Sequence, residues 1–188
     1  DGMALLQKFT ITSNGKITYQ NKFIKSEAYT KGIEKNRLVL GEFGTAATSD
    51  KSKSFFKKLT SFVLNPDEAT DNSLISIFPI SGHFMTLTQS PRCNKIDPKT
   101  LETLGGFEMG KKVDVVSYTA FPHVLKDGTA FNLGNSITST GAYYNIVRFP
   151  KDDQLMERME VVAKFPARLK FHPSNINMFG ITEHFFVI

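Results

Sequence analysis

Three short turn signals constrain the fold of this chain more than any other feature. Asn14-Gly15, Ser81-Gly82 and Asp127-Gly128 each lie between runs in which apolar and polar residues alternate. A pair of this type between alternating runs is a strong local signal for a β-hairpin, because Asn, Asp and Gly tolerate the backbone angles of a tight turn. The sequence therefore predicts hairpins over QKFTITSNGKITYQNKF, SLISIFPISGHFMTLT and HVLKDGTAFNLG.

Further β-rich runs follow at short intervals along the chain. They are RLVLGEF, DVVSYTAF, YYNIVRF, MEVVAKFP and ITEHFFVI. Strands of this length and spacing predict an all-β sandwich, barrel or propeller. The 188 residues are 40% hydrophobic, which is enough for one core. No linker or composition shift divides them, so we expect a single structural unit over residues 1–188.

One segment breaks the β pattern with the period of an amphipathic helix. Its apolar residues recur at helical spacing, and they are Phe55, Phe56, Leu59, Phe62 and Val63. Its lysines lie largely off that face, and they are Lys51, Lys57 and Lys58. Such a helix could lie on a membrane surface, or it could pack on the β core with its lysines in water. The sequence leaves both interpretations open.

Composition excludes some classes of function. The net charge is +5, but the basic residues are scattered among carboxylates and no nucleic-acid-binding motif is present, so we expect no nucleic-acid partner. No run approaches 18 consecutive apolar residues, so no membrane-spanning helix is predicted. Cys93 is the only cysteine and excludes an intrachain disulfide. These features favour a cytoplasmic protein that is at most peripheral to a membrane.

Six stretches together resemble the carotenoid cleavage oxygenases, most closely the animal branch that includes β-carotene oxygenases and the retinoid isomerase. They are DGMALLQKF, GEFGTAA, TDNSLISIFPISGHFMTLTQS, KIDPKTLETL, TAFPHVLKDGTAFNLG and HPSNINMFGITEHFFVI. Their order and spacing agree with the family from end to end, over well under half of a typical member. The chain is therefore similar to a partial member of this family.

The resemblance implies a seven-bladed β-propeller, of which this chain would supply about three blades and one short amphipathic helix. It also implies an Fe(II) ion on the propeller axis, held by four histidines, three of which are steadied by glutamates. A hydrophobic tunnel would bring a polyene to the iron, where O2 splits a double bond. A membrane-facing apolar patch lies near the segment that matches residues 51–64.

Three positions of this chain depart from the family's iron site. Phe121 stands where the family's Thr-Ala-His-Pro-His motif has its first, iron-binding histidine. Asn177 stands at the histidine of the family's His-Ser-Phe-Gly run, and Gln89 stands at a glutamate of a Thr-Glu-Thr stretch. A phenyl ring offers no lone pair and a neutral amide is a weak ligand, so the resemblance together with these changes predicts that iron is absent. His123 is the only polar group expected to remain near the axis, unless it is a structural histidine bonded to backbone.

Three functions remain open from the sequence. The first, which the sequence favours, is a non-catalytic protein that binds a carotenoid or retinoid. The second is part of an iron-dependent dioxygenase that cleaves a polyene double bond. The third is an interaction module, because a few blades of a propeller leave unpaired strand edges that favour self-association or a partner chain.

Overall fold

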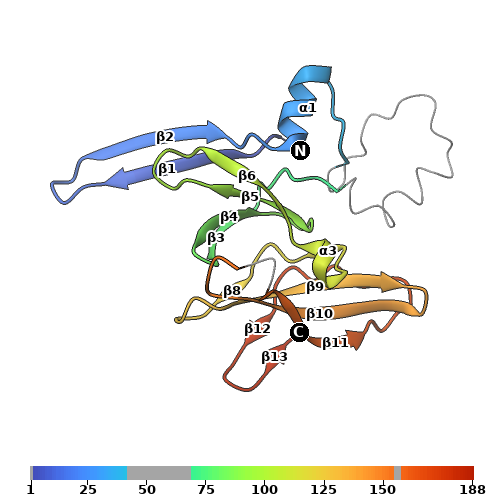
Figure 1. Ribbon diagram of the computed structural model, residues 1–188. Helices are drawn as coiled ribbons and strands as arrows, with labels where there is room; N and C mark the ends of the chain where they lie inside the picture. The colour runs from blue at the N-terminus through green and yellow to red at the C-terminus, as the bar shows by residue number, and fades with distance from the viewer. Residues whose placement is uncertain (1, 42–68, 155–157) are drawn as a thin grey trace.

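The structure, a computed structural model, describes residues 2–41, 69–154 and 158–188. These residues are mostly β-structure, as predicted, with few helices (Figure 1). The strands are β1 (Leu5–Ile11), β2 (Ile17–Phe23), β3 (Ser76–Ile80), β4 (His83–Leu87), β5 (Arg92–Ile96), β6 (Thr103–Glu108), β7 (Ser117–Tyr118), β8 (His123–Val124), β9 (Ala130–Thr138), β10 (Gly141–Phe149), β11 (Glu160–Pro166), β12 (Gly180–Ile181) and β13 (Phe186–Val187). The helices are α1 (Glu27–Lys35) and α3 (Gly110–Val113).

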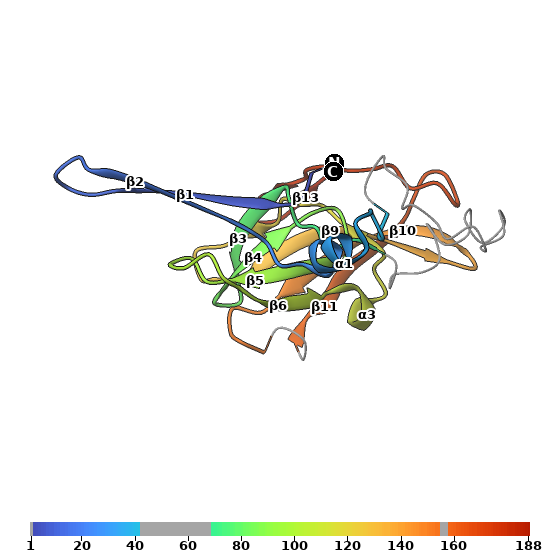
Figure 2. The same cartoon turned by 90° about the horizontal axis from the view of Figure 1, so that it is seen from above.

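Strands β1 and β2 form a long hairpin that projects from the rest of the molecule (Figures 1 and 2). Their antiparallel ladder runs from the pair Leu5–Phe23 to the pair Ile11–Ile17. The turn that joins them places Gly15 at a φ of 80°, and the Gly15 N–H donates to the Thr12 carbonyl oxygen at 2.9 Å. The hairpin predicted around Asn14-Gly15 is therefore confirmed.

Strands β3 to β6 form a four-stranded antiparallel sheet in chain order, the arrangement of a propeller blade. The loop between β3 and β4 is the pair Ser81-Gly82, with φ values of 50° and 76°. Positive φ at both residues is the signature of a type I′ turn, whose twist matches that of the flanking strands. The second predicted hairpin is confirmed by this geometry.

A second, larger sheet has the strand order β11-β10-β9-β7, and β8 pairs with β9 as well. The long pair β9 and β10 forms its centre, with a ladder from Ala130–Phe149 to Thr138–Gly141. The third predicted hairpin joins β8 to β9, and the Leu125 N–H donates to the Thr129 carbonyl oxygen at 2.8 Å across its turn. Within the described residues none of the sheets closes on itself, so the fold is an open set of blade-like units.

The main core joins the two larger sheets. Its buried side chains come from the strands of both sheets and from the segments that flank α3 and precede β11. They are Ile80, Met85, Leu87, Cys93, Met109, Val115, Tyr118, Ala120, Ala130, Val147, Phe149 and Met159. A second cluster covers the other side of β9 and β10 with residues that follow β11, namely Ala167 and Phe179. The C-terminal segment is thereby held against the large sheet.

Three features differ from the sequence predictions or lie beyond them. Helix α1 was not predicted, although Ser26 caps it by accepting a hydrogen bond from the Tyr29 N–H and Asn36 ends it in a left-handed conformation. The prediction of a strand over RLVLGEF is wrong for the residues of this run that the structure describes. Residues 38–40 form no strand, and Gly41 makes only an isolated bridge to Ala69. The run ITEHFFVI forms the small hairpin β12–β13 instead of one strand.

The amphipathic helix predicted around residues 51–64 lies outside the described residues. The residues that would form its two faces at the membrane surface are in the same segment, and they are Lys51, Phe55, Phe56, Lys57, Lys58, Leu59 and Phe62. Among the residues that are described, no helix is long and apolar enough to cross a membrane.

Candidate functional site

The three positions singled out in the sequence each lie just outside a strand. Gln89 follows β4, Phe121 lies between β7 and β8, and Asn177 precedes β12. The backbone links the first two regions, since the Tyr118 N–H donates to the Gln89 carbonyl oxygen at 3.2 Å. The loop that contains Gln89 therefore lies beside β7, which ends three residues before Phe121 in the chain.

Gln89 and Asn177 are in direct contact although they lie 88 residues apart in the chain. The Gln89 side chain donates from Nε2 to Oδ1 of Asn177 at 3.4 Å. At its other end, Oε1 of Gln89 accepts a hydrogen bond from Nδ2 of Asn175, also at 3.4 Å. Sequence reasoning missed Asn175. The signal was its spacing, because residues two apart in an extended segment share a face.

Hydrogen bonds fix the two residues that precede Phe121 in the chain. The Thr119 N–H donates to the Leu133 carbonyl oxygen at 2.8 Å, and the Thr119 hydroxyl donates to Oδ1 of Asn132 at 2.6 Å. The Ser76 hydroxyl donates to the Ala120 carbonyl oxygen. The Phe121 ring is half-buried and packs against the main core, so its position is set by the sheets on both sides.

His123 makes a backbone contact in the same region. Its Nε2 lies 2.6 Å from the carbonyl oxygen of Phe179, and because a carbonyl can only accept, this nitrogen carries the donated proton. The imidazole also meets the Phe179 ring edge to face, with 4.7 Å between ring centroids. With Nε2 engaged in this way, His123 ties the β7–β8 region to the C-terminal segment, which is the geometry of a structural histidine.

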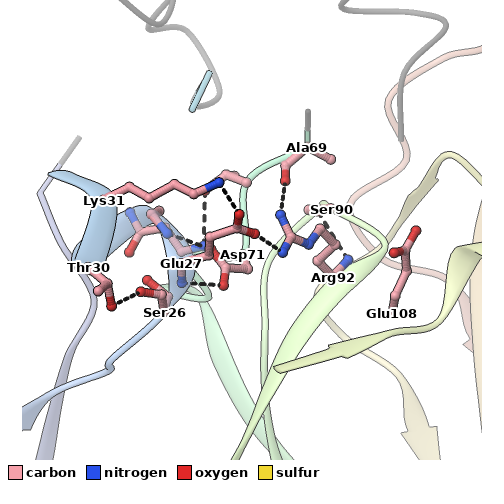
Figure 3. A network of polar contacts seen from close by, with 12 residues as sticks. Ser26, Glu27, Thr30, Lys31, Ala69, Asp71, Ser90, Arg92 and Glu108 are labelled. Atoms are coloured by element: carbon pink, nitrogen blue, oxygen red, sulfur yellow. Dashed lines mark hydrogen bonds and ion pairs between the residues drawn. The ribbon is translucent and has the colours of Figure 1, made fainter. Parts of the chain in front are cut away.

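A second polar cluster surrounds the N-terminus of α1 (Figure 3). The buried carboxylate of Asp71 accepts from the backbone N–H groups of Glu27 at 2.6 Å and Ala28 at 2.9 Å. These are N–H groups that a helix start leaves without partners, and the helix dipole favours a negative charge there. The adjacent Asn72 side chain accepts from the Ala4 N–H at 2.8 Å. The Thr-Asp-Asn motif is thus a structural link between α1, the first hairpin and the four-stranded sheet.

Arg92 on β5 completes this cluster. Its guanidinium donates to the Ala69 carbonyl oxygen at 3.0 Å and forms an ion pair with Glu27. Hydrogen bonds from Lys31 and then from Arg92 lower the pKa of the Glu27 carboxyl below its ordinary value. The contacts of Asp71, Glu27 and Arg92 tie α1 to β5, so this cluster stabilises the fold.

Cys93 lies beside Arg92 but has no access to solvent. Burial raises the pKa of its thiol, which keeps it protonated and unreactive. Its sulfur faces the Phe107 carbonyl oxygen at 3.6 Å. The thiol is a packed core group.

The match to a known family covers every residue of the chain. The family described as "Retinal pigment epithelial membrane protein" matches residues 1–188. The chain therefore belongs to the carotenoid oxygenase family. This is the family whose resemblance is visible in the six sequence stretches.

Curated members of the carotenoid oxygenase family align along the whole chain. The carotenoid isomerooxygenase of Drosophila melanogaster is 43% identical over 188 residues, which are 100% of this chain and 30% of that protein. The β,β-carotene 15,15′-dioxygenase of Gallus gallus is 37% identical over 196 residues, covering 100% of this chain and 37% of that enzyme. The chain thus spans about a third of the length of these relatives.

Solved structures of carotenoid oxygenases share the fold. Cobalt-substituted apocarotenoid oxygenase from Synechocystis matches 97% of this chain and 36% of its own with a TM-score of 0.66 and 18% identity. Lignostilbene dioxygenase from Pseudomonas brassicacearum matches 95% of this chain and 33% of its own with a TM-score of 0.64 and 18% identity. At this level of identity the likeness establishes the fold alone, and it confirms the prediction of a partial propeller.

The side chains at the three positions do not fit the iron centre that the family implies. Ferrous iron needs lone pairs, which imidazole supplies and the ring of Phe121 does not. The amide of Asn177 is a weak neutral donor, and its oxygen already accepts from Gln89. In the contact between these two side chains Gln89 donates and Asn177 accepts, whereas a supporting glutamate accepts from the ring N–H of a ligand histidine.

Proposed function

We propose that the protein is a non-catalytic member of the carotenoid oxygenase family that binds a carotenoid or a retinoid. The proposal is carried by one observation: Phe121, Asn177 and Gln89 occupy the three positions at which the resemblance places two iron ligands and a supporting carboxylate. Among the described residues, no group of three or more His, Cys, Asp or Glu side chains could hold a metal ion. A polyene is then bound and left intact.

The chemistry of the replacements supports binding over cleavage. A phenyl ring in place of an imidazole makes its surroundings more apolar, which suits a polyene chain. Loss of a supporting carboxylate alone typically lowers metal affinity or activity about 10- to 100-fold, and here two direct ligands change as well. Nearby turn and strand motifs are kept, since the hairpins around Gly82 and Gly128 have the expected geometry. The scaffold is therefore retained while the donor set is replaced.

An iron-dependent dioxygenase is the second candidate. It is favoured by the relatives, which are named as an isomerooxygenase and a dioxygenase and are 43% and 37% identical. In this alternative, iron is held in an altered way or with groups outside the chain. The two candidates make opposite predictions about metal content.

The test is to purify the protein from its natural source, record its visible spectrum and measure its iron. We expect a structured polyene absorption band with far less than one iron per chain. Stoichiometric iron would overturn the proposal and support the dioxygenase. A protein with neither a band nor iron would also contradict polyene binding, and the remaining function would be that of an interaction module.

A further inference from the structure

A polar cavity of about 190 Å³ lies beside the polar cluster at the start of α1. It shares no residue with the three positions at which the family resemblance places the iron site. The residues that line it come from the Thr-Asp-Asn motif, β5 and β6, and they are Asp71, Arg92, Cys93, Gly106, Phe107 and Glu108.

Glu108 contributes a carboxylate with one unpaired oxygen to this cavity. It lies opposite Arg92 in the β5–β6 ladder (Figure 3). Its Oε2 pairs with Nζ of Lys111 at 3.3 Å. Its Oε1 is buried and is the only such side-chain atom among the described residues that makes no hydrogen bond. Because buried polar atoms nearly always have a partner, this oxygen indicates that a donor group binds here.

Gly106 keeps space open on the same side of β6. Residues two apart on a strand share a face, so Gly106 lies on the face of Glu108. A Cβ atom at Gly106 would come no closer than 3.8 Å to Oδ1 of Asn94, which is an ordinary contact, and the φ of Gly106 is not positive. Neither packing nor backbone geometry therefore requires glycine here. Such a glycine within a strand often marks a place that a ligand approaches closely.

The charges around the cavity favour a cation. Two carboxylates, those of Asp71 and Glu108, line it together with the one guanidinium of Arg92. Burial alone would lower the pKa of Arg92, yet its hydrogen bond to Glu27 and the negative charges of the neighbouring carboxylates raise that pKa overall. Lys111 is 61% exposed, so solvent screens its charge.

We propose that this cavity binds a small free amine in its protonated form, whose ammonium N–H donates to Oε1 of Glu108. Asp71 offers further acceptor sites, because a carboxylate has about four lone-pair sites and Asp71 uses two of them for the N–H groups of Glu27 and Ala28. A divalent metal ion fits less well, since the described residues bring no group of three His, Cys, Asp or Glu side chains together.

The experiment titrates three small probes into the purified protein at constant ionic strength. Ethylammonium has both charge and N–H donors, tetramethylammonium has the charge alone, and ethanol has a donor without charge. Binding is followed by the NMR shifts of the backbone amides of Gly106 and Glu108. We expect ethylammonium to bind at least about tenfold tighter than either other probe, because a hydrogen bond to a charged group typically contributes more than the ~1.4 kcal/mol of a tenfold change.

Variants assign the binding to the cavity. Glu108→Gln removes the charge at nearly constant shape and should weaken ethylammonium binding at least about tenfold. Gly106→Ala places a methyl group beside the same oxygen and should also weaken it. Glu183→Gln, on an exposed glutamate of the β12–β13 turn, is the matched control and should leave the affinity unchanged. Circular dichroism establishes that each variant is folded.

Several results would overturn the proposal. Ethylammonium that does not bind, or binds no tighter than tetramethylammonium or ethanol, excludes a site for a protonated amine. Binding that survives in Glu108→Gln, or that Glu183→Gln weakens equally, removes it from this cavity. Nα-acetyllysine methylamide carries the same ammonium group on a peptide, and if it binds tighter than ethylammonium, the cavity receives a lysine of a partner instead of a free amine. None of these results bears on polyene binding.

Discussion

Three side chains of this chain stand at positions where the family resemblance places two iron ligands and a supporting carboxylate. Phe121, Asn177 and Gln89 lack the lone pairs or the charge that a ferrous ion needs. Two of them, Gln89 and Asn177, are joined by a hydrogen bond between their side chains. The scaffold around them should therefore accept the family's residues without large rearrangement.

The triple variant Phe121→His, Asn177→His, Gln89→Glu tests this expectation. It restores two imidazoles and a carboxylate that can accept a ring N–H, so we expect Co(II) to bind at least about tenfold tighter than to the unaltered protein. Isothermal titration calorimetry measures the affinity, and the visible absorption of Co(II) reports the ligands.

The matched control carries the same exchanges on exposed positions, namely Phe171→His, Asn21→His and Gln20→Glu. If the triple variant binds Co(II) no better than this control, the three positions do not form a metal site when their side chains are restored. The assignment of the family's iron ligands to these positions would then be wrong.

The elements of the fold differ in how far the sequence could predict them. The β3–β4 hairpin was predictable because Ser81-Gly82 has the turn chemistry that the geometry requires. The hairpin of β8 and β9 was predictable from Asp127-Gly128, but the pairing of the two-residue strand β7 with β9 is a contact that no local pattern encodes. Helix α1 was missed because its nine residues bury only Ala28, so it shows no apolar stripe. Its Ser26 cap was the available signal.

The contacts of Gln89 with Asn175 and Asn177 also could not be predicted from local sequence patterns. Gln89 and Asn177 could be assigned to one site only through the family resemblance, since 88 residues separate them. The spacing of Asn175 from Asn177 puts both on one face of the segment, but the contact of Asn175 with Gln89 became visible only in three dimensions. Contacts between loops depend on how the sheets pack against each other, and this packing cannot be read from local patterns in one sequence.

The ion pairs at the start of α1 predict a pH dependence of stability. The Glu27 carboxyl has a lowered pKa in the folded protein, because Lys31 and Arg92 donate to it. Its contribution to stability is therefore complete above the unfolded value, about pH 4 to 5, and is lost as the pH falls through the lowered pKa. Glu27→Gln should be less stable than the unaltered protein at pH 7, and this difference should shrink towards pH 3.

Urea unfolding at several pH values measures the difference. Glu34→Gln is the matched control, because Glu34 lies exposed on the same helix. We expect Glu34→Gln to follow the unaltered protein across the whole range. A gap between Glu27→Gln and the unaltered protein that stays constant from pH 7 to pH 3 would show that the Glu27 charge is not what stabilises the start of α1.

At the scale of the whole molecule, the projecting hairpin is the feature most at odds with a stable monomer (Figure 2). Side chains two residues apart on β1 and their partners on β2 share one face, and on this face the apolar members are Leu5, Phe9, Ile11, Ile17, Tyr19 and Phe23. All six are exposed, up to 72% for Ile11. The polar pair Gln7–Asn21 interrupts this face once, and exposed apolar surface of this extent normally marks an interface.

The opposite face of the hairpin carries lysines that contact the rest of the molecule. There Lys8 donates to the Lys99 carbonyl oxygen at 2.9 Å, and Lys22 pairs with Glu102 at 2.6 Å. These contacts hold the hairpin against the loop between β5 and β6 while its apolar face is left uncovered among the described residues. A second copy of the chain offers the same apolar face, so two copies can cover each other around a two-fold axis.

We therefore predict that the protein self-associates through the apolar face of β1 and β2. Sedimentation equilibrium should give an average mass that rises above the 21.0 kDa of one chain as concentration increases. The pair of changes Phe9→Ser and Ile17→Thr should shift the equilibrium towards the monomer, because it removes apolar area from the centre and the tip of the face. The control Phe171→Ser with Ile33→Thr removes two exposed apolar residues elsewhere and should have no effect. A chain that stays monomeric at every concentration, or a control that dissociates the assembly equally well, would place the interface elsewhere or exclude it.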